Sequence, residues 1–186
     1  MTAFLIILGL IVLVLVYGVF LYNALVRARQ MTREAWSGID VQLKRRADLI
    51  PNLIETVKGY ATHERETLEE VVSARNKAMA VSSSDVEGRA QAESMLSQAL
   101  GKLFALSESY PDLKASNNFL ELQSTLTELE SEIQMSRRYY NGAARVLNIQ
   151  VESFPSNLVA GRFGFTEQPY FEIEEPTDRA VPTVSF

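Results

Sequence analysis

The chain opens with an apolar run from Ala3 to Leu21 that contains no charged residue. As a helix rising about 1.5 Å per residue, this run is roughly 28 Å long, which matches the hydrocarbon core of a bilayer. It is apolar on every side, whereas a core helix of a soluble domain normally carries a polar stripe. A cleavable signal peptide normally begins with basic residues, and the first two residues here are Met and Thr. The pattern therefore predicts an uncleaved transmembrane anchor over residues 1–24.

Two interleaved series of mainly apolar residues with a seven-residue period follow the anchor and predict one long helix over about residues 22–80. The first series contains Trp36, Leu43, Ile50 and Val57, and the second contains Ile39, Arg46, Leu53 and Tyr60. Pro51 lacks the N–H that would donate to the carbonyl of Ala47, and its ring crowds that carbonyl. We therefore expect the helix to be kinked or split near Pro51.

Two further helices are expected, over about residues 86–109 and 113–151. The polar segment at residues 81–85 predicts the turn before the first of them, with Ser84 or Asp85 as its N-cap. The second has the clearest apolar period: Phe119, Leu126, Ile133, Tyr140 and Leu147. Three long amphipathic helices predict an all-α fold in which an antiparallel bundle over residues 25–153 continues directly from the anchor.

The helical pattern ends at Phe154-Pro155, and residues 154–186 are rich in proline and glycine. Glutamates and aromatic residues are also frequent there, which is unusual for a simple disordered linker. We expect an irregular aromatic and acidic tail that folds back in part onto the bundle, with about the last ten residues loose.

The composition of the chain excludes most of the catalytic and metal sites that enzymes use. The chain has no cysteine and one histidine, which excludes disulfides, thiolate metal sites and sites built from several histidines. His63 precedes Glu64, but the position of a second zinc-binding histidine on the same helical face is Thr67. We therefore expect no enzymatic activity, no metal and no cofactor, and a hydrolase built from carboxylates alone is the enzyme class left open. A formal net charge of −5 argues against a nucleic-acid partner.

Basic residues are concentrated directly after the anchor, beginning with Arg27, Arg29 and Arg33. Between Arg27 and Arg46 there are six basic residues and two acidic ones, whereas the other flank has no basic side chain. Basic flanks tend to stay in the cytoplasm, so the bulk of the chain is predicted to be cytoplasmic. The three arginines are expected to set this topology and contact membrane lipid, and lipid-selective recruitment is the alternative.

Arg46 occupies a position of the apolar seam, where an unpaired charge would cost several kcal/mol. The expected partners are Asp40, Asp48 or glutamates of the last long helix, and a second polar layer is expected around the RRYYN segment. The candidate residues are Asp40, Arg45, Arg46, Asp48, Arg137, Arg138 and Asn141. Two interpretations stay open: a buried ion network that sets the helix register, or a contact with a partner or another copy.

The segment WSGIDVQLKRRADLIPNL at residues 36–53 resembles the LemA family of bacterial membrane proteins. The resemblance continues through VKGYATHE at residues 57–64, RRYYN at 137–141 and FPSN at 154–157, and so covers nearly the whole chain. It implies a single N-terminal span in the bacterial cell (inner) membrane, followed by an antiparallel helical bundle. It implies no enzymatic reaction, and a magnetosome-membrane branch of the family implies a part in membrane shaping.

The leading hypothesis is a non-enzymatic, single-pass membrane protein whose long helices form a self-assembling scaffold. Its expected partners are membrane lipid and further copies of the same chain. The alternative is an adaptor that presents partner proteins to a membrane enzyme.

Overall fold

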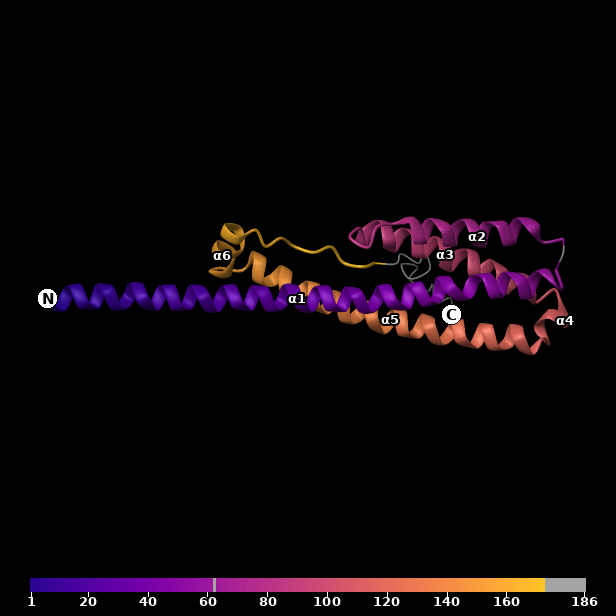
Figure 1. Ribbon diagram of the computed structural model, residues 1–186, viewed down its shortest axis with the longest axis horizontal. Coiled ribbons are helices and arrows are strands. Elements are labelled where there is room, and N and C mark those ends of the chain that lie inside the picture. Colours follow the sequence, from indigo (N-terminus) through magenta and orange to yellow (C-terminus); the bar gives the residue numbers. More distant parts are fainter. Residues whose placement is uncertain (62, 173–186) are drawn as a thin grey trace, which may run out of the picture. The chain divides into compact units, whose positions relative to one another are not determined.

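The computed structural model describes residues 1–61 and 63–172, and every regular element within them is a helix (Figure 1). The helices are α1 (Thr2–Lys58), α2 (Arg65–Ala80), α3 (Val86–Ser107), α4 (Pro111–Lys114), α5 (Asn117–Glu152) and α6 (Ser156–Phe163). The all-α prediction is confirmed. The loose end predicted for the last ten residues lies outside the described residues.

The described chain divides into two compact units, and α1 and α5 each contribute to both. The first unit, which we call the membrane-proximal unit, contains Met1–Ser37 and Arg138–Tyr170. The second, which we call the bundle unit, contains Gly38–Arg137 with Phe171 and Glu172. The sequence predicted an anchor over residues 1–24, a bundle over 25–153 and a tail over 154–186. These bounds do not coincide with the two compact units, and they stay predictions.

In the bundle unit, α1, α2, α3 and α5 run alternately in opposite directions, as Figure 1 shows. Short connections make this arrangement the natural one, because each helix returns beside the helix before it. Apolar faces of these helices meet in a core whose most deeply buried large side chains are those of Ile50, Leu53, Val57, Val71, Leu96, Leu103, Leu113 and Phe119. Asp85 caps α3 by accepting a hydrogen bond from the amide of Gly88, at 2.9 Å. Of the two predicted N-caps, the structure therefore selects Asp85.

α1 continues without interruption through Pro51 and ends at Lys58. This corrects the predicted split near Pro51, because the break between α1 and α2 falls at residues 59–64 instead. The carbonyl that Pro51 leaves without its usual donor belongs to Ala47. It accepts a hydrogen bond from Nε of Arg75 on α2, at 2.7 Å. The guanidinium replaces the missing amide, so the helix does not have to end there.

In the membrane-proximal unit, the end of α5 and all of α6 pack against α1 around a small core of Leu25, Ala28, Leu147, Ala160 and Phe165. α6 lies within the segment predicted to be irregular, so this part of the tail prediction is corrected. Ser156 and Ala160 are its buried residues, and burial of this small-residue face against the core stabilises a helix too short to persist alone. Gly164 ends α6 with φ of +70°, a conformation that suits glycine.

The apolar run at the start of α1 lies outside both cores. Among the described residues, α1 is the one helix long and apolar enough to cross a membrane, and none of its most apolar stretch is buried. Burial along α1 begins only near Leu25. A fully exposed apolar helix is unfavourable in water, which supports the predicted anchor.

The pairing of Arg75 with the Ala47 carbonyl gives a first test. We expect Arg75→Met to lower the free energy of unfolding by about 1–2 kcal/mol, because it leaves a carbonyl near the core unpaired. In a Pro51→Ala background the amide of residue 51 can donate to the carbonyl of Ala47. Arg75→Met should therefore lower the free energy of unfolding by less in that background. Chemical denaturation of the full chain in detergent, followed by circular dichroism, measures both effects.

Lys77→Met is the matched control, because Lys77 is an exposed cation on the same helix. It should change the stability by less than about 0.5 kcal/mol in either background. An equal cost of Arg75→Met with and without Pro51 would show that the guanidinium does not compensate for the proline.

Candidate functional site

A buried ion network lies at the centre of the bundle unit, and Arg46 of α1 is its most enclosed member. Its side chain is 2 % exposed. Nη2 donates to Oε2 of Glu93 on α3 at 2.5 Å, and Nη1 donates to Oε2 of Glu130 on α5 at 2.7 Å. Nη1 also lies 3.0 Å from Oγ of Ser97 on α3. The guanidinium therefore connects three helices through charge-assisted hydrogen bonds.

Arg89 of α3 extends the network to α2. It lies 3.3 Å from Glu93 through Nε and 3.1 Å from Oδ1 of Asp40 through Nη2. Its Nη1 donates to the carbonyl of Ala78, at 3.0 Å, and to that of Val81, at 3.4 Å. These carbonyls lie at the C-terminal end of α2, where a cation is also favoured by the helix dipole.

The network consists of two arginines and three carboxylates, from Asp40, Glu93 and Glu130. Glu93 lies between the two guanidinium groups and is as buried as Arg46, whereas the side chain of Glu130 is 38 % exposed. A buried charge is tolerated only when it is paired and hydrogen-bonded. Each carboxylate of the network is paired with a guanidinium, whereas Nε of Arg46 and Nε of Arg89 have no hydrogen-bond acceptor among the described residues. The network links α1, α2, α3 and α5.

The structure separates the seven polar residues singled out in the sequence. Arg46 and Asp40 belong to the network, and Arg46 reaches a glutamate of the last long helix as expected. Arg45 and Asp48 are exposed, and Arg45 donates to its neighbour Gln42 at 3.1 Å. Those two residues therefore lie outside the buried layer.

The second polar layer expected around Arg137, Arg138 and Asn141 stays a prediction. Arg138 is exposed, and Arg137 and Asn141 are half-buried. Neither arginine forms an ion pair with a residue in the described ranges 1–61 and 63–172. Their role as partner contacts stays a prediction.

The sequence reasoning missed Arg89 and Glu93, although α3 carries a signal for both. Glu93 shares a seven-residue series with Val86, Leu100 and Ser107, and Arg89 lies seven residues before Leu96. All of these residues are buried. Charges that interrupt two buried series on one helix are the same signal that singled out Arg46 on α1.

The three arginines that follow the apolar run differ in their surroundings. Arg27 and Arg33 are exposed, whereas Arg29 is half-buried, with its guanidinium 4.6 Å from the ring centre of Phe165. A cation over an aromatic face is attracted by the ring electrons. Arg29 therefore also helps to hold the segment after α6 against α1.

The segment after α6 is held along α5 in the same unit. Asn148 donates to the carbonyl of Gln168 at 2.9 Å and accepts from its amide at 2.8 Å. The hydroxyl of Tyr140 donates to the carbonyl of Pro169, at 2.8 Å, and its ring packs against Trp36. Burial raises the pKa of Tyr140 to about 12, so the hydroxyl keeps its proton at physiological pH.

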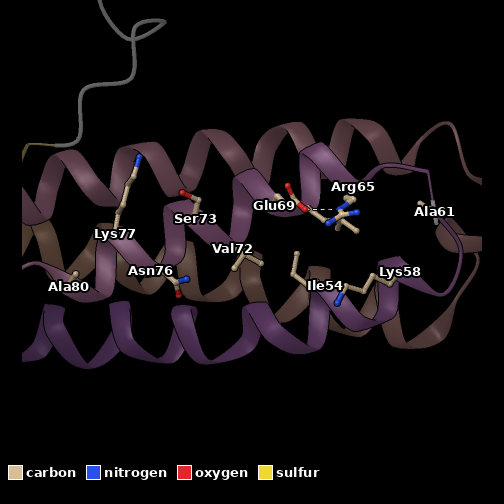
Figure 2. Close-up of a pocket in the computed structure, with 11 residues that line it drawn as sticks. Ile54, Lys58, Ala61, Arg65, Glu69, Val72, Ser73, Asn76, Lys77 and Ala80 are labelled. Carbon is tan, nitrogen blue, oxygen red and sulfur yellow. Dashed lines mark hydrogen bonds and ion pairs between the residues drawn. The ribbon is translucent and has the colours of Figure 1, made fainter.

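A groove of about 1040 Å³ lies between the end of α1 and α2, and we call it the α1–α2 groove (Figure 2). Its lining residues are Ile54, Lys58, Ala61, Arg65, Leu68, Glu69, Val72, Ser73, Asn76, Lys77 and Ala80. Basic residues outnumber acidic ones in this set by three to one. The groove can accept an apolar side chain, and it contains no nucleophile paired with a base.

No cluster of three or more metal-binding side chains occurs among residues 1–61 and 63–172. The histidine at position 63 lies in the connection between α1 and α2. The ion network has the residue types of a structural element, with each carboxylate paired to a guanidinium.

The network can be tested through Arg46. We expect Arg46→Leu to lower the free energy of unfolding by about 3–5 kcal/mol, because it leaves Glu93 buried with one of its two cations missing. Adding Glu93→Gln should restore part of the loss by removing that charge. Thermal and chemical unfolding of the full chain in detergent measure the change.

Arg45→Leu is the control, since it removes a neighbouring arginine that is exposed. Its effect should stay within about 0.5 kcal/mol. If Arg46→Leu unfolds cooperatively with a loss no larger than that of Arg45→Leu, the network does not hold the bundle together.

Comparison with known proteins finds relatives that match most of the chain. "Protein LemA" of Metamycoplasma hominis is 29 % identical over 170 residues, which cover 87 % of this chain and 76 % of that protein. "Magnetosome protein MamQ 2" of Paramagnetospirillum magneticum is 24 % identical over 186 residues, which cover 87 % of this chain and 68 % of that protein. "Magnetosome protein MamQ" of Magnetospirillum gryphiswaldense is 22 % identical with the same coverage.

The sequence model of the LemA family matches residues 35–186, which include the bundle helices and the segment after them. The exposed apolar start of α1 lies just before this match and indicates a membrane-associated helical protein. The resemblance seen in the sequence is thereby confirmed, and the chain belongs to the LemA family.

Proposed function

We propose that this chain is a non-enzymatic, single-pass membrane scaffold that assembles with further copies of itself. One observation carries the proposal, a line of exposed apolar side chains on α5. Its members are Tyr139, Val146 and Ile149, with Gly142 between the first two. Their spacing alternates between three and four residues, which is the period of a coiled-coil seam. We call these four residues the α5 stripe.

A second copy is the occupant that fits the α5 stripe. Copies inserted in one membrane in the same orientation are related by an axis along the membrane normal, so their α5 helices run parallel. Equivalent positions then meet, and a heptad stripe packs against itself. Gly142 has no described atom within 4 Å of an added Cβ, which leaves room for a neighbouring helix.

Lipid is a poor occupant for the Tyr139 end of the stripe. Tyr139 precedes Tyr140, whose ring packs against Trp36 of α1. Trp36 lies fourteen residues beyond Tyr22, which is roughly 21 Å along the helix. Since the apolar run ends at Leu21, this part of the stripe lies well beyond the hydrocarbon core.

Self-assembly through α5 would also gather the membrane spans. α1 carries the exposed apolar run and the residues of the ion network on one unbroken helix, without a flexible linker. A stack of such copies is suited to organising or shaping the membrane that contains the spans. The magnetosome proteins among the relatives are compatible with a role of this kind.

Cysteine crosslinking tests the assembly directly, because the chain contains no cysteine of its own. In native membranes, we expect Val146→Cys to form a disulfide-linked dimer on mild oxidation, since equivalent positions of a parallel pair lie near the axis. Leu120→Cys is the control, because Leu120 is an exposed residue of α5 outside the stripe. It should stay mainly monomeric.

Charge in the stripe should break the assembly without unfolding the protein. We expect Val146→Glu with Ile149→Glu to reduce the number of copies per nanodisc, counted by single-molecule photobleaching, whereas Leu120→Glu leaves it unchanged. A wild-type chain that stays monomeric over a wide range of protein-to-lipid ratios would contradict the proposal.

A second candidate function, an adaptor for a partner protein, is favoured by the α1–α2 groove. Val72 is exposed and lies among apolar neighbours such as Ile54. Lys58, Arg65 and Lys77 give the rim a positive charge that exceeds the single negative charge of Glu69. An amphipathic helix with acidic residues beside its apolar face is the partner that matches this surface.

Photo-crosslinking separates the adaptor from the scaffold. With a photoreactive residue at Val72 in the full chain, the adaptor function predicts an adduct with a different protein, which Lys58→Glu with Lys77→Glu should abolish. The same residue at Met95, exposed on α3, is the control. Recovery of self-adducts alone would contradict the adaptor function.

A further inference from the structure

We propose that α6, together with Phe154 just before it, forms a second membrane contact. Exposed apolar side chains of this segment enter the lipid–water interface beside the span. The side chains are Phe154, Leu158 and Phe163, and we call them the α6 patch. The inference rests on the proposed insertion of α1 in the membrane. It goes further in assigning a lipid-binding surface to a part of the chain outside the span.

The position of α6 along α1 is fixed by aromatic contacts. The ring of Tyr22 lies 4.9 Å from that of Phe163 and 5.7 Å from that of Phe165, measured between ring centres. Tyr22 directly follows the apolar run, which ends at Leu21. α6 therefore lies beside α1 where the apolar run ends, and Figure 1 shows the two helices next to each other. With α1 inserted as proposed, this is the level where the span leaves the hydrocarbon core.

α6 turns its small residues inward and its large apolar residues outward. Ser156 and Ala160 are buried against the core of the membrane-proximal unit. The exposed fractions of Phe154, Leu158 and Phe163 are 79 %, 65 % and 58 %. A helix in water normally shows the opposite pattern, so this one lacks a covering surface in the structure.

The neighbouring charges fit a lipid headgroup region. The guanidinium of Arg162 lies 6.0 Å from the ring centre of Phe163. Arg27 is exposed on α1, near the end of the apolar run. Glu152 and Glu167 are exposed at the two ends of the segment, so apolar burial rather than net charge must supply most of the binding.

A lipid surface is favoured over a protein partner because the patch continues an existing apolar surface. The exposed run of α1 ends with Phe20, and Phe163 packs on Tyr22 two residues later. Aromatic side chains are enriched at this depth, where their rings contact both acyl chains and headgroups. Membrane lipid next to the span would therefore also cover the α6 patch.

Spin labelling tests the contact in the full-length protein, which has no cysteine of its own. Leu158→Cys and Phe154→Cys are labelled separately in nanodiscs of phosphatidylcholine and phosphatidylglycerol. Collision rates with oxygen, which concentrates in lipid, and with a water-soluble nickel complex report the depth of the label. We expect both labels to favour oxygen, at a depth of roughly 5–10 Å below the headgroup boundary.

Leu120→Cys is the matched control, because it is an exposed leucine on a helix of the bundle unit. Its label should favour the nickel complex. Labels at Leu158 and Phe154 that resemble the control would overturn the inference. Labels shielded from both reagents would also overturn it, because another protein surface would then cover the patch.

This experiment is independent of assembly. If the α6 labels lie in water while Val146→Cys still crosslinks, the second membrane contact fails and the scaffold proposal stands. If the α6 labels lie in lipid while the protein is monomeric, the second membrane contact stands and the scaffold proposal fails.

Discussion

The bundle depends on one buried cation. Arg46 of α1 pairs with carboxylates on both α3 and α5, and Arg89 of α3 donates a hydrogen bond to a carbonyl at the end of α2. An apolar core alone would tolerate small shifts of one helix along another, whereas paired charges in a low dielectric lose most of their stabilisation when they move apart. The network therefore selects one alignment of four helices.

The guanidinium of Arg75 satisfies an unpaired backbone group in α1. Pro51 would normally interrupt α1, but Arg75 donates to the carbonyl that the proline leaves without a donor. Both cases follow the rule that buried polar groups must be paired. Because the helix continues, the exposed apolar run and Arg46 belong to one element.

Local patterns in the sequence predicted the span, the helical fold and the seam position of Arg46. The continuity of α1 through Pro51 was not predictable, because it depends on a side chain of another helix, that of Arg75. α6 was missed for a similar reason, since its short apolar pattern is stable only where Ala160 packs against the core. Arg89 and Glu93 interrupt buried series on α3, and that signal was present in the sequence but was not used.

The level of an exposed apolar surface along α1 decides what covers it. α6 meets α1 at Tyr22, directly after the apolar run. The α5 stripe continues to Tyr139, whose neighbour Tyr140 packs against Trp36, roughly 21 Å farther along α1. With α1 inserted as proposed, α6 lies at the level of the lipid headgroups and Tyr139 lies in water. One surface is therefore suited to lipid and the other to a second copy. The proposed scaffold needs both, because contact between copies shapes a membrane only if each copy is held against it.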